Sequence, residues 1–515
     1  MERRHFLKTT AAGSAFLATS GLWNLNKAFA ANPYNVIWCF QSQRDIPIAY
    51  EVDVLIVGGS TAGVAAAVAA SKQGAKVFLT AQETYLGEDI CANFRCWNGD
   101  QSTELGKKLF GGGQPTPMHV KRSLDQELIA HNIGFMYSTY VTELVIDSTG
   151  EPSGVVIANR SGRQAIIAKT IIDATPRAMV TRMSKAHFSD FPSGKHTFNF
   201  VVVGNDKKSG EGLSVVNSST TIKREETVYP VTEYAFNVEM PDASWASFAR
   251  AEQKVRDLTW DANQVESSDQ LFQVPPDKIK GQKQWDKETI DAQTISLKVF
   301  QPKKTDRLYV LGGCADIPRK AAAQLLHPGA LICIGERIGQ EAAFQSTMVN
   351  SKKIHIEGGD KVADTNGDVG ELLEGVRPSL NLGVVKADQS QLPILGTYDV
   401  VVMGGGTAGA PAGIGAARNG ASTLVIEYLH GMGGIGTQGM IGRYWYGYRH
   451  GFTNEVDNGV KAIGGNNPRQ KNKLDEWVFD WKTEWYRSNI RKAGGEIWFG
   501  VIGIGAYVEN KQVKG

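Results

Sequence analysis

Cysteine is scarce in this sequence. Five of the 515 residues are cysteines, and no two of them form a Cys-x-x-Cys pair. Because iron–sulfur clusters usually need four thiolates at a recognisable spacing, we expect neither a cluster nor another metal site within the chain. Cys91 and Cys96 stand close enough for one disulfide in an oxidising compartment, but they also suit small buried positions, which is the interpretation we favour.

The chain also lacks an excess of charge and a long apolar run. Lysine and arginine number 55 against 53 acidic residues, so the formal net charge is +2. A nearly neutral chain does not suit a nucleic-acid partner that is recognised through a basic surface. After the first thirty residues, no run of 18 or more apolar residues predicts a membrane span. A chain of 515 residues exceeds the usual single core, so we expect at least two domains.

The N-terminus, by contrast, carries an export signal. Arg3 and Arg4 lie in a segment that resembles the twin-arginine signal, and a mildly apolar stretch follows over residues 11–25. Residues 28–30, Ala-Phe-Ala, supply a small-x-small cleavage site. Residues 1–30 are therefore predicted to be a signal peptide recognised by the twin-arginine export machinery, and the mature protein is expected in the periplasm.

A glycine-rich motif at residues 404–409 follows an apolar run and opens an Ala-rich helical stretch. This order predicts a buried strand, a tight turn and a helix whose N-terminal amides bind a pyrophosphate. A second predicted strand, 422–426, ends at an acidic residue, about where the ribose hydroxyls of a dinucleotide need an acceptor. The candidate cofactor-binding residues of this copy are Gly404, Gly406, Ala408, Gly409 and Glu427.

An earlier copy of the motif, at residues 58–63, departs from the pattern. Ser60 replaces the middle glycine, and Ala81 stands where the acidic residue is expected. A small serine still fits beside a ligand, but the missing carboxylate removes a strong hydrogen-bond acceptor. This copy therefore either binds a cofactor or is a fold kept for structure, and we favour binding. Its candidate residues are Gly58, Gly59, Ser60, Ala62 and Gly63.

The two motifs begin an internal repeat with an offset of 346 residues, the distance from Gly58 to Gly404. Such a long period indicates duplicated domains rather than a solenoid. The first copy continues with a predicted strand at 168–175 and a glycine-spaced helix at 329–343, which the second copy lacks. The final segment, 506–515, then begins a hairpin without a partner strand. We therefore expect the sequence to be a fragment of a longer protein.

These patterns predict an α/β protein. A Rossmann-like dinucleotide-binding domain is expected over residues 48–345, and alternation between apolar and polar residues predicts an antiparallel substrate domain inserted at about 190–300. Residues 346–396 are expected to form a linker or a small connecting element, because residues 350–391 are polar, with one helical piece at 371–377. Residues 397–515 are expected to form a second, truncated Rossmann-like domain. The family resemblance described next implies that the cofactor of such a Rossmann-like FAD-binding domain is FAD.

The sequence resembles the FAD-dependent oxidoreductase family related to the flavin subunit of heterodisulfide reductase, among the glutathione-reductase-like flavoproteins. The likeness implies non-covalent FAD and an inserted substrate domain, but it implies no substrate. Two departures are Ala81 and Pro176, which stands in place of the family's usual glycine. The likeness also implies cofactor-binding roles for Asp173, Gly312, Gly313 and Asp316. The residues that carry it are 57–63, 172–175, 311–316 and 404–427.

Three candidates for a catalytic base or proton relay stand near the expected flavin. Tyr446 and His450 lie in an aromatic and basic segment, and His327 precedes a predicted helix. Each also suits a structural role, as a residue of a packed surface loop or as a satisfied histidine. We predict an exported FAD oxidoreductase that dehydrogenates a small polar metabolite, such as a sugar or organic acid, and passes electrons to a separate acceptor. The alternatives are a flavin-binding electron-transfer subunit that docks to a redox partner and an inactive fragment.

Overall fold

Two long parallel strands organise the larger sheet of the protein. The computed structural model describes residues 37–96, 99, 101–204, 206–224, 226–350, 352–358, 366–470 and 476–515, so the predicted signal peptide lies outside it. β2 (Arg44–Val57) and β7 (Gly162–Asp173) pair in parallel, and Val57 lies opposite Asp173. Their apolar residues are buried on both faces, as is usual for parallel strands between helices.

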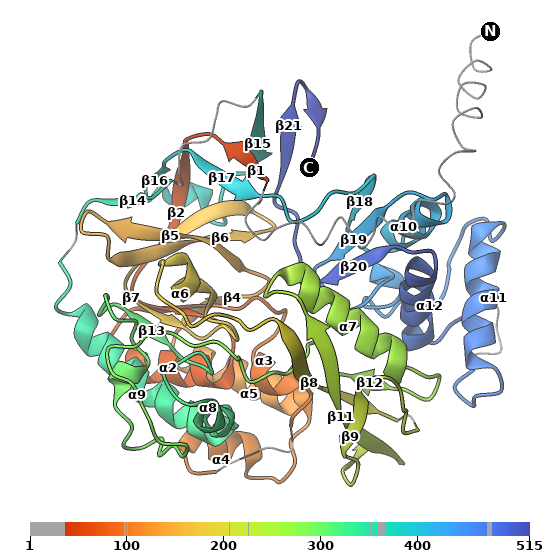
Figure 1. Ribbon diagram of the computed structural model, residues 1–515, viewed down its shortest axis with the longest axis horizontal. Coiled ribbons are helices and arrows are strands. Elements are labelled where there is room, and N and C mark those ends of the chain that lie inside the picture. Colours follow the sequence, from red (N-terminus) through yellow and green to blue (C-terminus); the bar gives the residue numbers. More distant parts are fainter. Residues whose placement is uncertain are drawn as a thin grey trace.

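The carboxyl halves of these strands form a Rossmann-type parallel sheet. The parallel order is β13-β7-β2-β3-β4, so that these strands end at one edge. Helices α2, α5 and α9 gather beside this part of the sheet (Figure 1). The added elements are β3 (Val77–Thr80), β4 (Gly134–Met136), β13 (Leu308–Val310), α2 (Thr61–Lys72), α5 (Pro117–Ala130) and α9 (Pro328–Ser346).

Helices α2 and α9 touch along a line of small residues. A Cβ atom on Gly335 would lie 2.4 Å from the Ala62 carbonyl oxygen, and one on Gly339 would lie 2.2 Å from that of Ala66. Only glycine permits the two backbones to approach this closely. The predicted glycine-spaced helix thus packs directly against the helix of the first glycine turn.

The other ends of β2 and β7 continue into a mainly antiparallel part of the same sheet, which corrects the predicted linker. Four strands complete it in the order β7-β6-β5-β14-β16-β2. Two of them, β14 and β16, come from residues 346–396. They join the sheet because Ile356, Val385 and Ala387 bury their side chains against Ile46 and its neighbours. The strands are β5 (Tyr140–Asp147), β6 (Pro152–Asn159), β14 (Ile354–Ile356) and β16 (Val384–Ala387).

Two further strands come from the expected linker. β17 (Ser390–Pro393) pairs with β1 (Trp38–Gln41), and β15 (Gly367–Glu371) pairs with β21 (Gly505–Glu509). The helix predicted at 371–377 is wrong, since Gly375 has a positive φ of 74° and interrupts the backbone there. The prediction that the final hairpin lacks a partner strand is wrong too, because β15 covers β21.

A separate five-stranded antiparallel sheet lies between β7 and β13 in the sequence, where the inserted region was predicted. Its order is β10-β11-β8-β12, and β9 also pairs with β11. Phe198, Phe200 and Phe236 are buried beneath α7 (Trp245–Thr259). The strands are β8 (Gly194–Val203), β9 (Leu213–Asn217), β10 (Thr221–Arg224), β11 (Thr227–Met240) and β12 (Glu266–Ser267).

A second parallel sheet carries the second glycine turn. Its order is β18-β19-β20, with Val400 opposite Thr423. Val54 lies opposite Val77 in the first sheet, so the register repeats with the 346-residue offset. We call residues 44–173 with 308–346 the first unit and residues 397–499 the second unit. The elements of the second unit are β18 (Val400–Met403), α10 (Gly409–Arg418), β19 (Thr423–Glu427), η3 (Gly434–Gly436), α11 (Phe452–Gly464), α12 (Phe479–Lys492) and β20 (Glu496–Phe499).

Short elements complete the chain. The free thiols of Cys91 and Cys96 are both buried, as favoured from the sequence.

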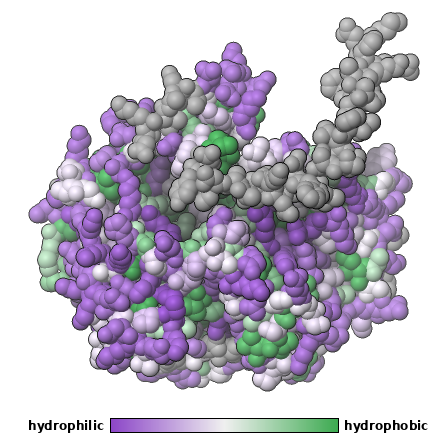
Figure 2. Space-filling view, viewed as in Figure 1, coloured by the Kyte–Doolittle hydropathy of each residue, from purple (hydrophilic) through white to green (hydrophobic). Residues whose placement is uncertain are grey.

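None of the described helices is both long and apolar enough to span a membrane. The face shown in Figure 2 is mostly hydrophilic, with apolar side chains in separate patches. The short elements are α3 (Glu88–Cys91), α4 (Glu104–Phe110), α6 (Met179–Met183), η1 (Leu297–Val299), α8 (Arg319–Leu325), η2 (Pro378–Leu380) and β22 (Gln512–Val513).

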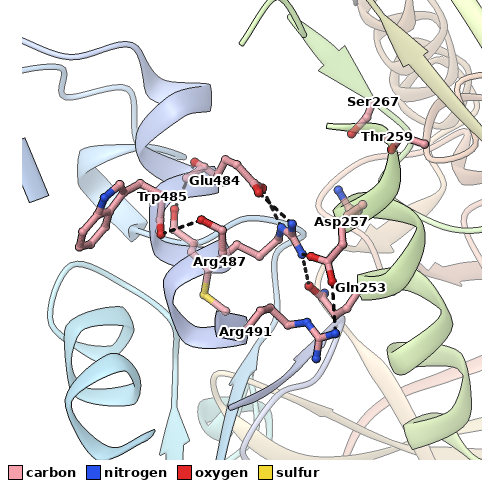
Figure 3. Close-up of polar contacts among 12 residues, drawn as sticks. Gln253, Asp257, Thr259, Ser267, Glu484, Trp485, Arg487 and Arg491 are labelled. Atoms are coloured by element: carbon pink, nitrogen blue, oxygen red, sulfur yellow. Dashed lines mark hydrogen bonds and ion pairs between the residues drawn. The ribbon is translucent and has the colours of Figure 1, made fainter. Parts of the chain in front are cut away.

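A buried arginine joins the second unit to α7 of the antiparallel sheet (Figure 3). Arg487 donates to both carboxylate oxygens of Glu484, at 2.7 and 2.8 Å. From the other side it forms an ion pair with Asp257 at 2.7 Å and donates to Gln253 at 3.1 Å. Its side chain is only 4% exposed, so the guanidinium depends on these partners.

Because loss of Arg487 leaves Glu484 buried without its cation, we expect Arg487→Ala to lower the free energy of unfolding by about 3–5 kcal/mol. Arg491 is the matched control. It pairs with the same Asp257 at 3.2 Å but is 31% exposed, so Arg491→Ala should cost about 1 kcal/mol or less. Urea denaturation followed by tryptophan fluorescence measures both, and equal losses would contradict the role given to Arg487.

Candidate functional site

The first glycine turn is shaped by close backbone contacts. Gly58 has a φ of 116°, and a Cβ atom on it would lie 2.6 Å from the backbone of Ala174 at the end of β7. A Cβ atom on Gly63 would lie 2.6 Å from the Gly58 carbonyl oxygen. Glycine is therefore required where β2 turns sharply into α2.

Acidic side chains of the protein itself lie at the start of α2, directly after this first turn. The Asp89 carboxylate accepts from the Thr61 amide at 2.8 Å and from the Thr61 hydroxyl at 2.5 Å. Ser60 caps the helix by accepting from the Gly63 amide at 3.0 Å. Glu88 is 4% exposed, and burial followed by the nearby Glu83 carboxylate raises the pKa of its carboxyl well above the ordinary value.

The second glycine turn has the same backbone geometry as the first, but no carboxylate accepts a hydrogen bond from its Thr407 amide among the described residues. Gly404 has a φ of 92°, and a Cβ atom on Gly409 would lie 1.8 Å from the Gly404 carbonyl oxygen. Glu427, at the end of β19, accepts from the Gly405 amide at 2.8 Å and from the Leu429 amide at 3.1 Å. The acid predicted to hold a ribose is thus fixed beside the turn.

The residues just before α10 lie at the surface. Thr407 and Ala408 are exposed, whereas their counterparts Thr61 and Ala62 are fully buried, Ala62 against Gly335 of α9. Within the described part of the chain, the amides of Gly406, Thr407 and Ala408 donate to no acceptor. Opposite them Gly434 has no side chain, and a Cβ atom there would lie 2.9 Å from Gly406 Cα. The second turn therefore fits the pyrophosphate and ribose of FAD, whereas the first turn, closed by Asp89 and Glu88, does not.

The candidates from β7 and β13 gather at the edge where these strands end. Asp173 accepts four hydrogen bonds, from the amide and hydroxyl of Thr175 and of Thr181, which fix the segment after β7. Gly312 lies beside this segment, since its Cβ position is 3.8 Å from the Thr175 carbonyl oxygen. Asp173 lies opposite Val57, the residue before the first turn, but its hydrogen bonds serve the protein itself.

Gly313 and Asp316 follow on the loop after β13. A Cβ atom on Gly313 would lie 2.7 Å from Pro275, so glycine is required there. Asp316 accepts from the Gly281 amide at 3.0 Å and pairs with Lys278 at 2.7 Å. Both positions therefore fasten the loop of residues 275–283 to the first unit.

The three predicted catalytic residues all lie at the surface. Tyr446 is 93% exposed, and His450 is exposed in the same loop, 6.1 Å between ring centroids from Tyr448. His327 is the exposed residue that precedes α9. The structure brings none of these side chains into contact with another candidate residue.

A buried histidine that sequence reasoning missed stands where three parts of the chain meet. His430 Nε2 is 3.5 Å from Glu83 of the first unit, and Nδ1 is 3.7 Å from Glu252 of α7. Burial lowers the pKa of His430, but the two carboxylates outweigh it and hold that pKa well above the ordinary value. A charged His430 therefore links the two units and the antiparallel sheet. Its position three residues after Glu427 was the only signal in the sequence.

His430 also lines a polar cavity of about 190 Å³ between the antiparallel sheet and the second unit. Arg256 and Arg487 bring further positive charge to it, and Asp269 and Glu484 bring negative charge. A cavity of this size and polarity suits a small hydrophilic molecule better than an apolar one.

Lys482, another residue missed from the sequence, is 2% exposed in the core of the second unit. Its Nζ lies 3.2 Å from the centre of the Trp477 ring and 3.3 Å from the Tyr444 hydroxyl. Burial lowers the pKa of Lys482 to about 8, although Asp457 raises it. An isolated lysine within a helix gives no sequence signal of such burial.

The sequence matches the family described as FAD dependent oxidoreductase over residues 53–273 and 399–491. The two ranges include both glycine turns and cover more than half of the chain. The protein therefore belongs to the FAD-dependent oxidoreductase family, an enzyme family whose cofactor is FAD.

Several solved structures resemble the fold at low identity. OxyS anhydrotetracycline hydroxylase from Streptomyces rimosus is 14% identical, with 56% of this chain and 62% of that chain covered and a TM-score of 0.33. The flavin-dependent brominase Bmp2 is 11% identical, with 58% and 80% covered and a TM-score of 0.35. L-proline dehydrogenase from P. horikoshii is 10% identical, with 56% and 93% covered and a TM-score of 0.34. No curated protein matches the sequence.

The buried Lys482 predicts a dependence of stability on pH. Its pKa is about 8 in the folded chain and 10.5 ordinarily, so between these values the unfolded chain binds more protons and stability rises with pH. We expect Lys482→Met to remove this rise and, by removing a buried charge, to stabilise the fold by about 2 kcal/mol at pH 7. Urea denaturation at pH 7 and 10 measures both effects. The exposed Lys461→Met is the control, and equal pH profiles for the two variants would contradict the assignment.

Proposed function

We propose that the protein is an exported FAD-dependent oxidoreductase that dehydrogenates a small polar metabolite of the sugar or organic acid class. The observation that carries this proposal is the second glycine turn, whose exposed amides face Gly434 and whose Glu427 is held beside them. Gly404, Gly406, Ala408 and Gly409 would hold the pyrophosphate on the N-terminus of α10, and Glu427 would accept from the ribose hydroxyls. FAD, when bound, supplies the hydride acceptor.

The polar cavity at His430 supports the proposed class of substrate. Arg256 and His430 provide cationic donors for a carboxylate or for several hydroxyl groups. Its walls come from the antiparallel sheet and the second unit, which agrees with a substrate-binding role for the antiparallel sheet. Electrons would then pass to a separate acceptor, and the predicted twin-arginine signal would direct the protein to the periplasm.

Purified protein should show the absorption spectrum of bound oxidised flavin, which bleaches when the substrate reduces it. A panel of sugars and organic acids, added without oxygen, tests the proposed substrate class. Bleaching by one class supports the dehydrogenase. Flavin that only a redox partner protein reduces would instead favour an electron-transfer subunit, and the absence of flavin after incubation with FAD would contradict both. Apolar alcohols serve as the control panel.

The second unit supports a further part of the proposal, domain duplication. Val400 lies opposite Thr423 as Val54 lies opposite Val77, so the two parallel sheets share one register at the 346-residue offset. In the first unit, β2 also pairs with β7 and α2 packs against α9. In the described part of the second unit β18 pairs only with β19, and Val401 and Met403 are 49% and 57% exposed.

A further inference from the structure

Equivalent threonines stand at the first residue of α2 in the first unit and two residues before α10 in the second, but their hydrogen bonds differ. Thr61 gives its amide and its hydroxyl to Asp89. The hydroxyl of Thr407, its counterpart at the 346-residue offset, donates to the Gly433 carbonyl at 3.0 Å. The Thr407 amide donates to no acceptor among the described residues. One helix start is therefore satisfied by a carboxylate from its own chain, and the other is available.

The loops that face the two turns make the same backbone hydrogen bond at the 346-residue offset, which locates this carboxylate. Gly87 donates to the Gly59 carbonyl at 2.7 Å, and Gly433 donates to the Gly405 carbonyl at 2.8 Å. The following residue is Glu88 in the first unit and Gly434 in the second. Asp89 therefore takes the position of Ile435, whose side chain is 67% exposed. The two loops therefore differ at these two positions, and only the first loop carries a carboxylate that reaches the start of its helix.

Charge and space both explain why the closed turn excludes a dinucleotide. The start of a helix attracts an anion through its free amides and its dipole, and a carboxylate and a pyrophosphate compete for the same amides. With Asp89 bound to the amide and the hydroxyl of Thr61, a pyrophosphate would meet a carboxylate at that amide. Ala81 also offers no acceptor for a ribose, in contrast to Glu427.

We propose that the Asp89 carboxylate replaces the cofactor pyrophosphate in the first unit, so that the chain holds a single FAD, in the second unit. The inference rests on the proposed function, because it takes FAD binding at the second turn as given. The first unit then serves as a scaffold that carries the antiparallel sheet, and its glycine turn is kept for the packing of α2 against β7 and α9.

The number of FAD molecules per chain is the first test. The full chain is incubated with excess FAD, freed of unbound flavin by gel filtration and denatured, and the released flavin is measured by absorbance. We expect one FAD per chain. Two per chain would overturn this inference alone, whereas none would overturn the proposed function.

Transfer of the carboxylate to the second unit is the decisive test. Ile435→Asp should place an acid opposite the Thr407 amide and weaken FAD binding at least about tenfold, measured by the quenching of flavin fluorescence. Ile435→Asn has nearly the same shape without the charge and should bind within about twofold of the native chain, as should Asp89→Asn. Circular dichroism confirms folding, which an exposed position tolerates.

The variants also identify the opposite result. Unchanged FAD binding in Ile435→Asp would overturn the inference, because a carboxylate would then not block a glycine turn. Loss of FAD in Asp89→Asn would overturn it as well, since it would place the cofactor in the first unit.

Discussion

The first amides of a helix lack partners within that helix, and this requirement governs both glycine turns of the protein. In the first unit, Ser60 and Asp89 satisfy it from within the chain. In the second unit, the corresponding amides stay available at the surface. Two turns with one backbone geometry thus differ in chemistry, because the choice of acceptor, not the glycines, decides what the helix start binds.

Buried charge holds the parts of the molecule in place around the second turn. Arg487 fastens α12 to α7, and His430 stands between Glu83 of the first unit and Glu252 of α7. Such pairs cost desolvation, so each cation must keep its carboxylates, and this fixes one arrangement of the units more strictly than apolar packing does. The position of the polar cavity beside His430 follows from that arrangement.

The sequence predicted much of the local structure and little of the side-chain chemistry. Both strand–turn–helix motifs, the antiparallel sheet and the glycine-spaced helix α9 lie where their patterns placed them. The predicted linker failed because β14 and β16 have only three and four residues, too few for a clear pattern, and gain their apolar contacts from strands distant in the sequence. Tyr446, His450 and His327 were chosen by residue type and proved exposed, whereas buried Lys482 and His430 gave almost no pattern.

By itself, the sequence determined the two glycine turns, the position of Glu427 and membership of the flavin family, because these features depend on residues adjacent along the chain. Only the tertiary structure decided that the first turn is closed. Asp89 lies 28 residues from Thr61, and nothing local brings its carboxylate to that amide. The folding of the loop after β3 back onto the start of α2 does so, and hydrogen bonds across such distances follow from packing rather than from local propensity.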